Sequence, residues 1–297
     1  MKSWRVSLLW WLLRAGRASY PLVSLRLARL SFEAMGELFS MMARGPVLKL
    51  KVGQVDAEVL EKRFSPGARI IFYLHGGAFV SGSARTHRHL VGRIAREANS
   101  SAIVINYRLA PEFPYPAALE DAFFAYQWVC GQNIQASRMA LVGDSAGGCL
   151  AVALIQRLIK ENLPLPACLC LLSPWVDLTC SLPSYETRAR LDPMISRELA
   201  MERARWYAGG KDLADPEVSP LRGEFHGFPP VLILVGSHEV LHDDAVQLTR
   251  KLSQAGRNVS LEIWRGMFHV WPYVFPLLPE GRQALTRVGS FIRSHLA

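Results

Sequence analysis

No long run of one charge occurs in this 297-residue chain, although Lys and Arg outnumber Asp and Glu by 34 to 25. The basic side chains are scattered, and zinc-finger, RNA-binding and glycine-rich phosphate-loop patterns are all missing. We therefore expect no nucleic-acid partner. We interpret the net charge of +9 as that of a solvated surface with no particular role. Contacts with anionic membranes or acidic ligands remain an alternative.

Cysteine is also scarce, with five residues that lie mostly inside apolar runs. An odd number of such residues is typical of reduced core positions in an intracellular protein. Cys168 and Cys170 have no second pair nearby, so they make a poor zinc site. We expect no metal and a cytoplasmic location.

No apolar run approaches the roughly 20 residues that span a bilayer. The run Val6–Leu13 follows Lys2 and Arg5 like the start of a signal peptide, but Arg14 and Arg17 come next instead of a cleavage site. We expect an amphipathic helix that docks on the body of the protein. A weak membrane-surface contact through this helix is left open.

Residues 1–44 are helical in pattern, with breaks near Gly16 and Tyr20-Pro21, and are rich in large apolar side chains. We expect them to form a helical cap; an ordinary helix pair packed on the core is the alternative. In residues 45–297 strands alternate with helices, which favours a mainly parallel sheet flanked by helices. Residues 180–215 interrupt this alternation and are interpreted as a cap insertion.

The expected elements follow from apolar periodicity and turn residues. The strands are a hairpin of Val47–Val52 and Asp56–Arg63, then Arg69–Leu74, Ala102–Tyr107, Met139–Val142, Ala167–Leu172, Val231–Val235 and Ser260–Trp264. The helices include Thr86–Ala98, Ala117–Val129, Ser196–Tyr207, Asp243–Gly256 and Glu280–His295.

A Gly-x-Ser-x-Gly sequence, Gly143 to Gly147, joins an apolar strand to an apolar helical run. This is the pattern of a nucleophile elbow, a tight turn that exposes the serine hydroxyl. The two glycines lack the Cβ atoms that would collide across the turn. Ser145 is therefore the candidate nucleophile.

A nucleophilic serine needs a base and a group that orients the base. In this fold pattern both follow the serine, at the ends of the last two strands. His269 follows the last strand and is the candidate base. Glu239 follows the strand before it and is the favoured acid, with Asp243 and Asp244 as alternatives. Those two aspartates head a helix, where capping would occupy them.

The tetrahedral intermediate needs N–H donors around its oxyanion. Ala146 follows the nucleophile and is expected to supply one donor; the loop of Gly76, Gly77 and Ala78 is expected to supply the others. His75 is interpreted as a structural residue that holds this loop. The remaining histidines in polar or helical contexts are expected to be exposed: His87, His89, His226, His242 and His295.

Six motifs from residue 70 onward resemble the hormone-sensitive-lipase-like (bacterial family IV) esterases of the α/β-hydrolase superfamily. They are His75–Ala78, Tyr107–Glu112 with Tyr115–Asp121, Gly143–Gly148, Ser173–Asp177, Gly236–Asp244 and Gly266–His269. The resemblance implies an α/β-hydrolase core under a cap, and ester hydrolysis without a cofactor.

Two positions depart from the family pattern. Ala78 stands where the family usually has glycine; its N–H stays usable if its φ is negative, and the acyl pocket narrows. Glu239 stands where aspartate is common, and its longer side chain reaches the same imidazole.

The expected function is a serine carboxylesterase that hydrolyses short- to medium-chain esters through an acyl-enzyme. The expected partner is a small-molecule ester, and a homodimer is left open. A membrane-surface lipase is one alternative, suggested by the Trp- and Arg-rich N-terminal stretch. An inactive hydrolase-fold receptor is another, which the presence of Ser145 and His269 disfavours.

Overall fold

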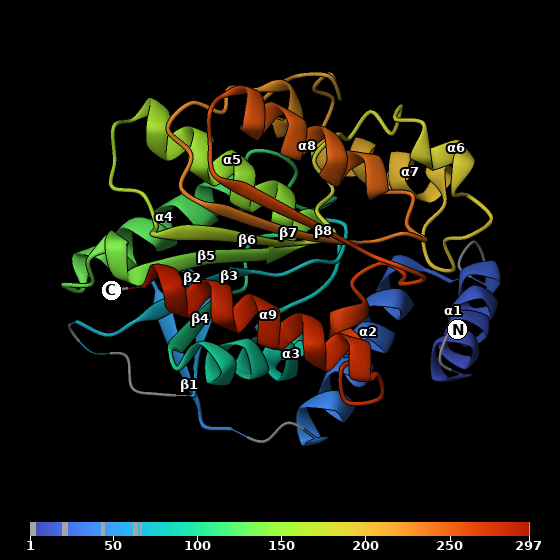
Figure 1. Ribbon diagram of the computed structural model, residues 1–297, viewed down its shortest axis with the longest axis horizontal. Helices are drawn as coiled ribbons and strands as arrows, with labels where there is room; N and C mark the ends of the chain where they lie inside the picture. Colours follow the sequence, from blue (N-terminus) through green and yellow to red (C-terminus); the bar gives the residue numbers. More distant parts are fainter. Residues whose placement is uncertain (1–3, 20–22, 43–44, 62–64, 66, 297) are drawn as a thin grey trace.

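An eight-stranded sheet in the order β1-β2-β4-β3-β5-β6-β7-β8 runs through the molecule (Figure 1). The computed structural model describes residues 4–19, 23–42, 45–61, 65 and 67–296. β2 pairs antiparallel with β1 and β4, and the other neighbouring strands pair in parallel. The strands are β1 Val47–Val52, β2 Val55–Leu60, β3 Ile70–Leu74, β4 Ser101–Ile105, β5 Met139–Asp144, β6 Cys168–Leu172, β7 Val231–Gly236 and β8 Val259–Trp264.

Helices cover both faces of this sheet. In Figure 1, α4, α5 and α8 lie above the sheet and α3 and α9 below it. Along β3, the side chains of Ile70, Phe72 and Leu74 belong to the upper core, and those of Ile71 and Tyr73 to the lower one. The helices are α1 Trp4–Ser19, α2 Leu25–Met42, α3 Ala84–Ala98, α4 Ala117–Gly131, α5 Ala146–Lys160, α6 Ser184–Thr187, α7 Arg197–Ala208, α8 His242–Gln254 and α9 Pro279–His295.

Because the central strands are buried on both faces, their sequences are continuously apolar instead of alternating. This confirms the predicted α/β-hydrolase fold with a mainly parallel sheet. The predicted helix in the insertion is α7, which begins after Ser196; the Ser196 side chain accepts a hydrogen bond from the Leu199 N–H. The short α6 was not predicted.

One predicted break in the N-terminal region is wrong: α1 continues through Gly16 to Ser19. A single glycine costs a helix only about 1 kcal/mol, which tertiary contacts beyond it offset. The second predicted break, at Tyr20-Pro21, lies outside the described residues. Within the described ranges, no helix is both long and apolar enough to span a membrane.

The helix α1 docks on the backbone of residues 189–192 in the insertion. The indole N–H of Trp10 donates to the Leu191 carbonyl at 2.8 Å, and Arg14 donates to the Arg190 carbonyl at 3.2 Å. Arg17 donates to two carbonyls, those of Ala189 at 3.2 Å and Asp192 at 2.6 Å. The N-terminal helix therefore docks on the body of the protein, as its sequence predicted.

The variant Arg17→Gln tests this docking. Because it removes two charge-assisted bonds that are partly exposed, we expect the free energy of unfolding to fall by about 1–2 kcal/mol. Hydrogen exchange in α1 should accelerate more than exchange in α5. The control Arg26→Gln removes the same charge from an exposed position of α2. Unchanged exchange in α1 of Arg17→Gln would contradict the docking role.

Candidate active site

Ser145 lies in a sharp turn between β5 and α5, with φ of 53° and ψ of −121°. Its N–H donates to the Leu172 carbonyl at 2.9 Å, which ties the turn to β6. A Cβ on Gly143 would lie 2.4 Å from the Gly147 carbonyl oxygen, and one on Gly147 would lie 2.0 Å from that of Leu74. Only glycine fits at these two positions. Ser145 lies between them and adopts the strained, positive-φ backbone conformation of the turn.

His269 follows β8 and lies between Ser145 and Glu239. Its Nε2 is 2.9 Å from Ser145 Oγ, and its Nδ1 is 3.0 Å from Glu239 Oε2. All three side chains are buried, with Glu239 fully so. A carboxylate at Nδ1 keeps a proton on that nitrogen, which leaves Nε2 to accept one from the serine.

The other carboxylate oxygen of Glu239 is also occupied. It accepts hydrogen bonds from Ser173 Oγ at 2.8 Å and from the Gly236 N–H at 2.5 Å. Ser173 Oγ in turn accepts from the N–H of Val270, next to the base, at 3.1 Å. Ser173 lies in one of the motifs shared with the family, but nothing local in the sequence shows that its hydroxyl joins two later loops.

Asp243 and Asp244 lie in the first turn of α8, but the structure contradicts their predicted capping role. Neither aspartate caps the helix; the side chain that accepts from its first turn is that of Ser184, whose Oγ lies 3.2 Å from the Asp243 N–H. Asp244 instead accepts from the N–H groups of Val176 at 2.8 Å and Asp177 at 2.9 Å, and Asp243 from that of Ser184 at 2.9 Å. Both therefore support the chain that follows β6, because tertiary packing brings its N–H groups close to them.

The predicted oxyanion donors differ in their availability. The N–H of Gly76 donates to Asp144 Oδ1 at 2.9 Å, so this donor is already engaged. Gly77 and Ala78 are partly exposed, and Ala146 is the first residue of α5, where N–H groups lack an intrahelical acceptor. In this structure the N–H of Gly76 therefore already has an acceptor, and the oxyanion role of the other three residues stays a prediction.

The backbone of Ala78 is also not as expected, because its φ is 55° and not negative. The left-handed conformation costs a non-glycine residue about 1–2 kcal/mol. This cost explains why the family usually has glycine at this position.

A buried polar network lies beneath the oxyanion loop. Asp144 Oδ1 also accepts from the Tyr73 hydroxyl at 2.7 Å, and its Oδ2 lies 3.5 Å from His87 Nε2. Burial lowers the pKa of His75 to about 3, so this ring is neutral. Its Nδ1 lies 2.8 Å from the carbonyl oxygen of Gly76.

His87 and His89 are fully buried, so their predicted exposure is wrong. They lie on α3, which packs between the sheet, α2 and α9.

The charges around His269 favour its protonated form. Burial alone would lower the pKa of its imidazole, but the hydrogen bond and charge of Glu239 act in the opposite direction. The carboxylates of Asp192 and Asp144 add to this effect. The net result is a pKa above the ordinary value for histidine.

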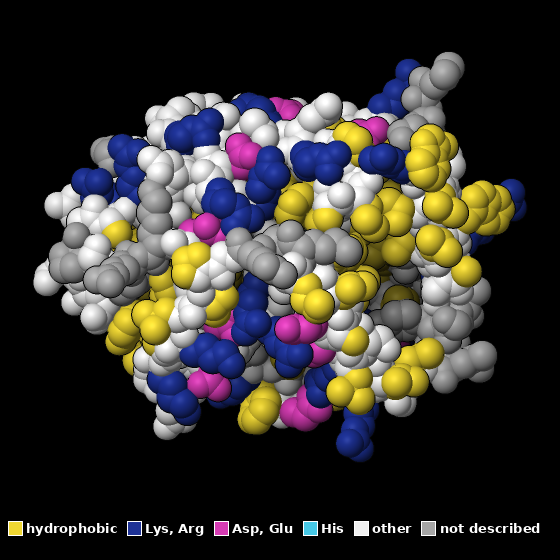
Figure 2. Space-filling model, turned by 90° about the horizontal axis from the view of Figure 1, so that it is seen from below, with side chains coloured by type: hydrophobic (Ala, Val, Ile, Leu, Met, Phe, Trp, Pro, Cys, Tyr) yellow, Lys and Arg dark blue, Asp and Glu magenta, His cyan; other side chains and the backbone are white. Residues whose placement is uncertain are grey.

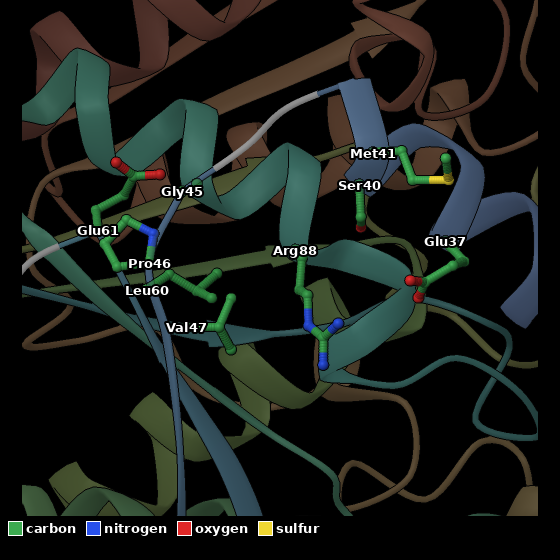
Figure 3. Close-up of a pocket in the computed structure, with 10 residues that line it drawn as sticks. Glu37, Ser40, Met41, Gly45, Pro46, Val47, Leu60, Glu61 and Arg88 are labelled. Carbon is green, nitrogen blue, oxygen red and sulfur yellow. The ribbon is translucent and has the colours of Figure 1, made fainter.

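A pocket of about 230 Å³ lies elsewhere, between α2, α3 and the β1–β2 hairpin (Figure 3). Arg88 and Glu37 extend into it from α3 and α2, and neither Ser145 nor His269 lines it. This pocket is therefore separate from the Ser–His–Glu arrangement. Among the described residues, no group of three or more His, Cys, Asp or Glu side chains is placed to hold a metal ion.

Comparisons with known proteins agree with this geometry. A family model for the alpha/beta hydrolase fold matches residues 71–273. An acetyl-hydrolase of Streptomyces hygroscopicus is 40% identical, covering 90% of this chain and 89% of the relative. An esterase of Acinetobacter venetianus is 33% identical over 88% and 87%.

One solved structure is similar to this chain over its whole length. It is the crystal structure of an esterase from the bacterial hormone-sensitive lipase family. It superposes with a TM-score of 0.93 at 39% identity and covers 100% of both chains. This chain therefore belongs to the hormone-sensitive-lipase-like esterases of the α/β-hydrolase superfamily.

Proposed function

We propose that this carboxylesterase hydrolyses short- to medium-chain esters through an acyl-enzyme on Ser145. His269 acts as the general base and Glu239 orients it. The observation that carries the proposal is the continuous chain of contacts from Ser145 Oγ through both nitrogens of His269 to Glu239. The relatives named acetyl-hydrolase and esterase support a small-molecule ester as the substrate.

The reaction starts when Ser145 Oγ attacks the ester carbonyl and its proton passes to His269 Nε2. The resulting imidazolium is stabilised by the adjacent Glu239 carboxylate. The imidazolium then gives this proton to the leaving alkoxide, and the acyl group stays on Ser145. A water molecule then attacks the acyl-enzyme while His269 again takes up a proton. The carboxylic acid is released and Ser145 is free again.

The developing oxyanion lies against the N–H groups of Gly77 and Ala146; Ala78, whose φ is positive, does not meet the condition set for a further donor. Each such donor contributes about 2.7–4 kcal/mol to lowering the barrier. Gly76 acts indirectly, because its bond to Asp144 ties the oxyanion loop to the residue before the nucleophile.

The N-terminal helices and the 180–215 insertion are proposed to form a cap over this site. Arg29 of α2 donates to the carbonyl of Val80, just after the oxyanion loop, at 2.6 Å. It also donates to the carbonyl of Ala110 at 2.9 Å. Tyr207 of α7 stacks on Phe79, with ring centroids 3.7 Å apart. These contacts connect both segments to the chain beside the oxyanion loop, which supports their role as a cap. We propose that this cap limits the length of the acyl groups that bind.

The identity of the nucleophile is tested with Ser145→Ala. We expect turnover of p-nitrophenyl acetate to fall by about 10⁶-fold, because the acyl-enzyme cannot form. An organophosphate should label Ser145 in the wild-type protein, as peptide mass spectrometry would show. A p-nitrophenyl ester series would then define the acyl length. Labelling of another residue, or retained turnover, would refute the assignment.

The raised pKa of His269 predicts the pH dependence of catalysis. Only the neutral imidazole accepts the serine proton, so kcat/KM should rise with pH through a midpoint above about 6.5. Glu239→Gln removes the adjacent negative charge, so the midpoint should move to lower pH. The same variant should lower kcat by roughly 10⁴-fold, because the imidazolium loses its partner.

The control for this variant is Asp243→Asn, which should leave the midpoint in place. A shifted midpoint in Asp243→Asn together with an unchanged one in Glu239→Gln would show that the aspartate is the acid.

A further inference from the structure

The helix α1 carries apolar side chains on two sides. Val6, Leu9 and Leu13 lie on the inner side and pack on the lower core. The outer side carries a stripe of side chains at helical spacing that are more than half exposed: Trp4 at 70%, Leu8 at 51%, Trp11 at 67% and Leu12 at 61%. Docking on the insertion therefore leaves these four apolar side chains largely in solvent.

A second exposed stripe lies along one side of α2, with members three or eight residues apart. Its large members are Leu27 at 52%, Leu30 at 57%, Leu38 at 54% and Met41 at 66% exposed. Figure 2 shows hydrophobic side chains gathered around a hollow at the right of the molecule, where Figure 1 places α1 and α2. We call these two stripes the α1–α2 apolar surface.

The charge on this surface distinguishes between two occupants. Arg5 of α1 and Arg26 of α2 are exposed, whereas Arg14 and Arg17 are bonded to carbonyls of the insertion on the docked side. In a symmetric dimer, a second copy would bring the same exposed arginines to the contact and no acidic side chain of α1. Anionic lipid headgroups complement these charges, and exposed Trp side chains favour the boundary between headgroups and acyl chains.

We propose that the α1–α2 apolar surface binds anionic membrane surfaces, with α1 lying in the lipid interface. Its inner side stays docked on the protein, so binding requires no unfolding of the helix. The interaction goes beyond the proposed ester hydrolysis and does not depend on it.

The test is flotation of the full chain with two kinds of vesicle. One kind contains equal parts phosphatidylglycerol and phosphatidylcholine, and the other contains phosphatidylcholine alone. We expect binding to the anionic vesicles that high salt weakens. The double variant Trp4→Gln/Trp11→Gln should bind at least about tenfold more weakly. Its turnover of soluble p-nitrophenyl acetate should be normal, because both side chains point away from the docked side.

The matched control is Phe124→Gln, which removes a side chain 48% exposed on α4 and should leave vesicle binding unchanged. Equal flotation of wild type and the double variant would overturn the proposal. So would a wild-type dimer that floats with neither vesicle and dissociates on the double substitution, because a second copy would then be the occupant.

A separate observation concerns Asp192, a carboxylate with no exposed surface at the point where α1 meets the insertion. Its Oδ2 accepts from the N–H of Val240 at 2.9 Å, and Val240 directly follows Glu239. Its Oδ1 accepts from the N–H groups of Met194 at 2.8 Å and Ile195 at 2.9 Å. Asp192 therefore joins the insertion to the loop that carries the proposed acid.

We infer that Asp192 is a positioning residue that holds the Glu239 loop. This inference rests on the proposed triad. The titratable and charged groups acting on His269 are Glu239, Asp192 and Asp144. Of these, Asp192 alone comes from the insertion.

The variant Asp192→Asn keeps the shape and removes the charge. We expect kcat to fall by about tenfold with KM little changed, since loop geometry is loosened. The midpoint of the acidic limb should move to lower pH, because a negative charge near His269 is gone. Asp192→Glu keeps the charge and alters the geometry, so it should lower kcat with less shift of the midpoint.

The control is Asp244→Asn, another buried carboxylate that binds two backbone N–H groups. It should lower stability without moving the midpoint. A merely structural Asp192 would behave in the same way, and that result would overturn the inference. Failure of the triad itself would appear separately, as residual turnover in Ser145→Ala.

Discussion

The burial of the Glu239 carboxylate is the constraint on which the site depends. A fully buried charge is tolerated only when its lone pairs are occupied by hydrogen bonds. Glu239 meets this condition through Ser173 after β6, Gly236 at the end of β7 and His269 after β8. One side chain thus joins the ends of three parallel strands. It also holds His269 against Ser145 at the end of a fourth.

Four non-glycine residues at the same edge of the sheet have strained backbones. Ala78, Ser145, Ser173 and Val270 all have positive φ values, between 45° and 55°, although none is glycine. Each is a proposed site residue or is bonded to one. Such conformations cost free energy and persist only where the surrounding structure holds them. The layered core supplies that support, because the strands beneath these residues are buried on both faces.

The N-terminal helices connect this edge to the outside of the molecule. The inner side of α1 binds residues 189–192, and Asp192 binds the loop of the proposed acid. The outer side of the same helix exposes Trp4 and Trp11 to solvent. A single helix therefore has one surface directed at the catalytic loops and another directed away from the protein.

The sheet could be predicted from the amino-acid sequence, because strands buried on both faces must be continuously apolar. The elbow could be predicted too, since Gly143 and Gly147 are required wherever the backbone passes so close to itself. Chain order after Ser145 pointed to His269 and Glu239. The contacts of Ser173, Asp192 and the Gly76 N–H, and the burial of His87 and His89, became visible only in the folded chain. These depend on contacts between segments far apart in the chain, and a local pattern contains no information on which distant N–H group or helix will lie opposite a polar side chain.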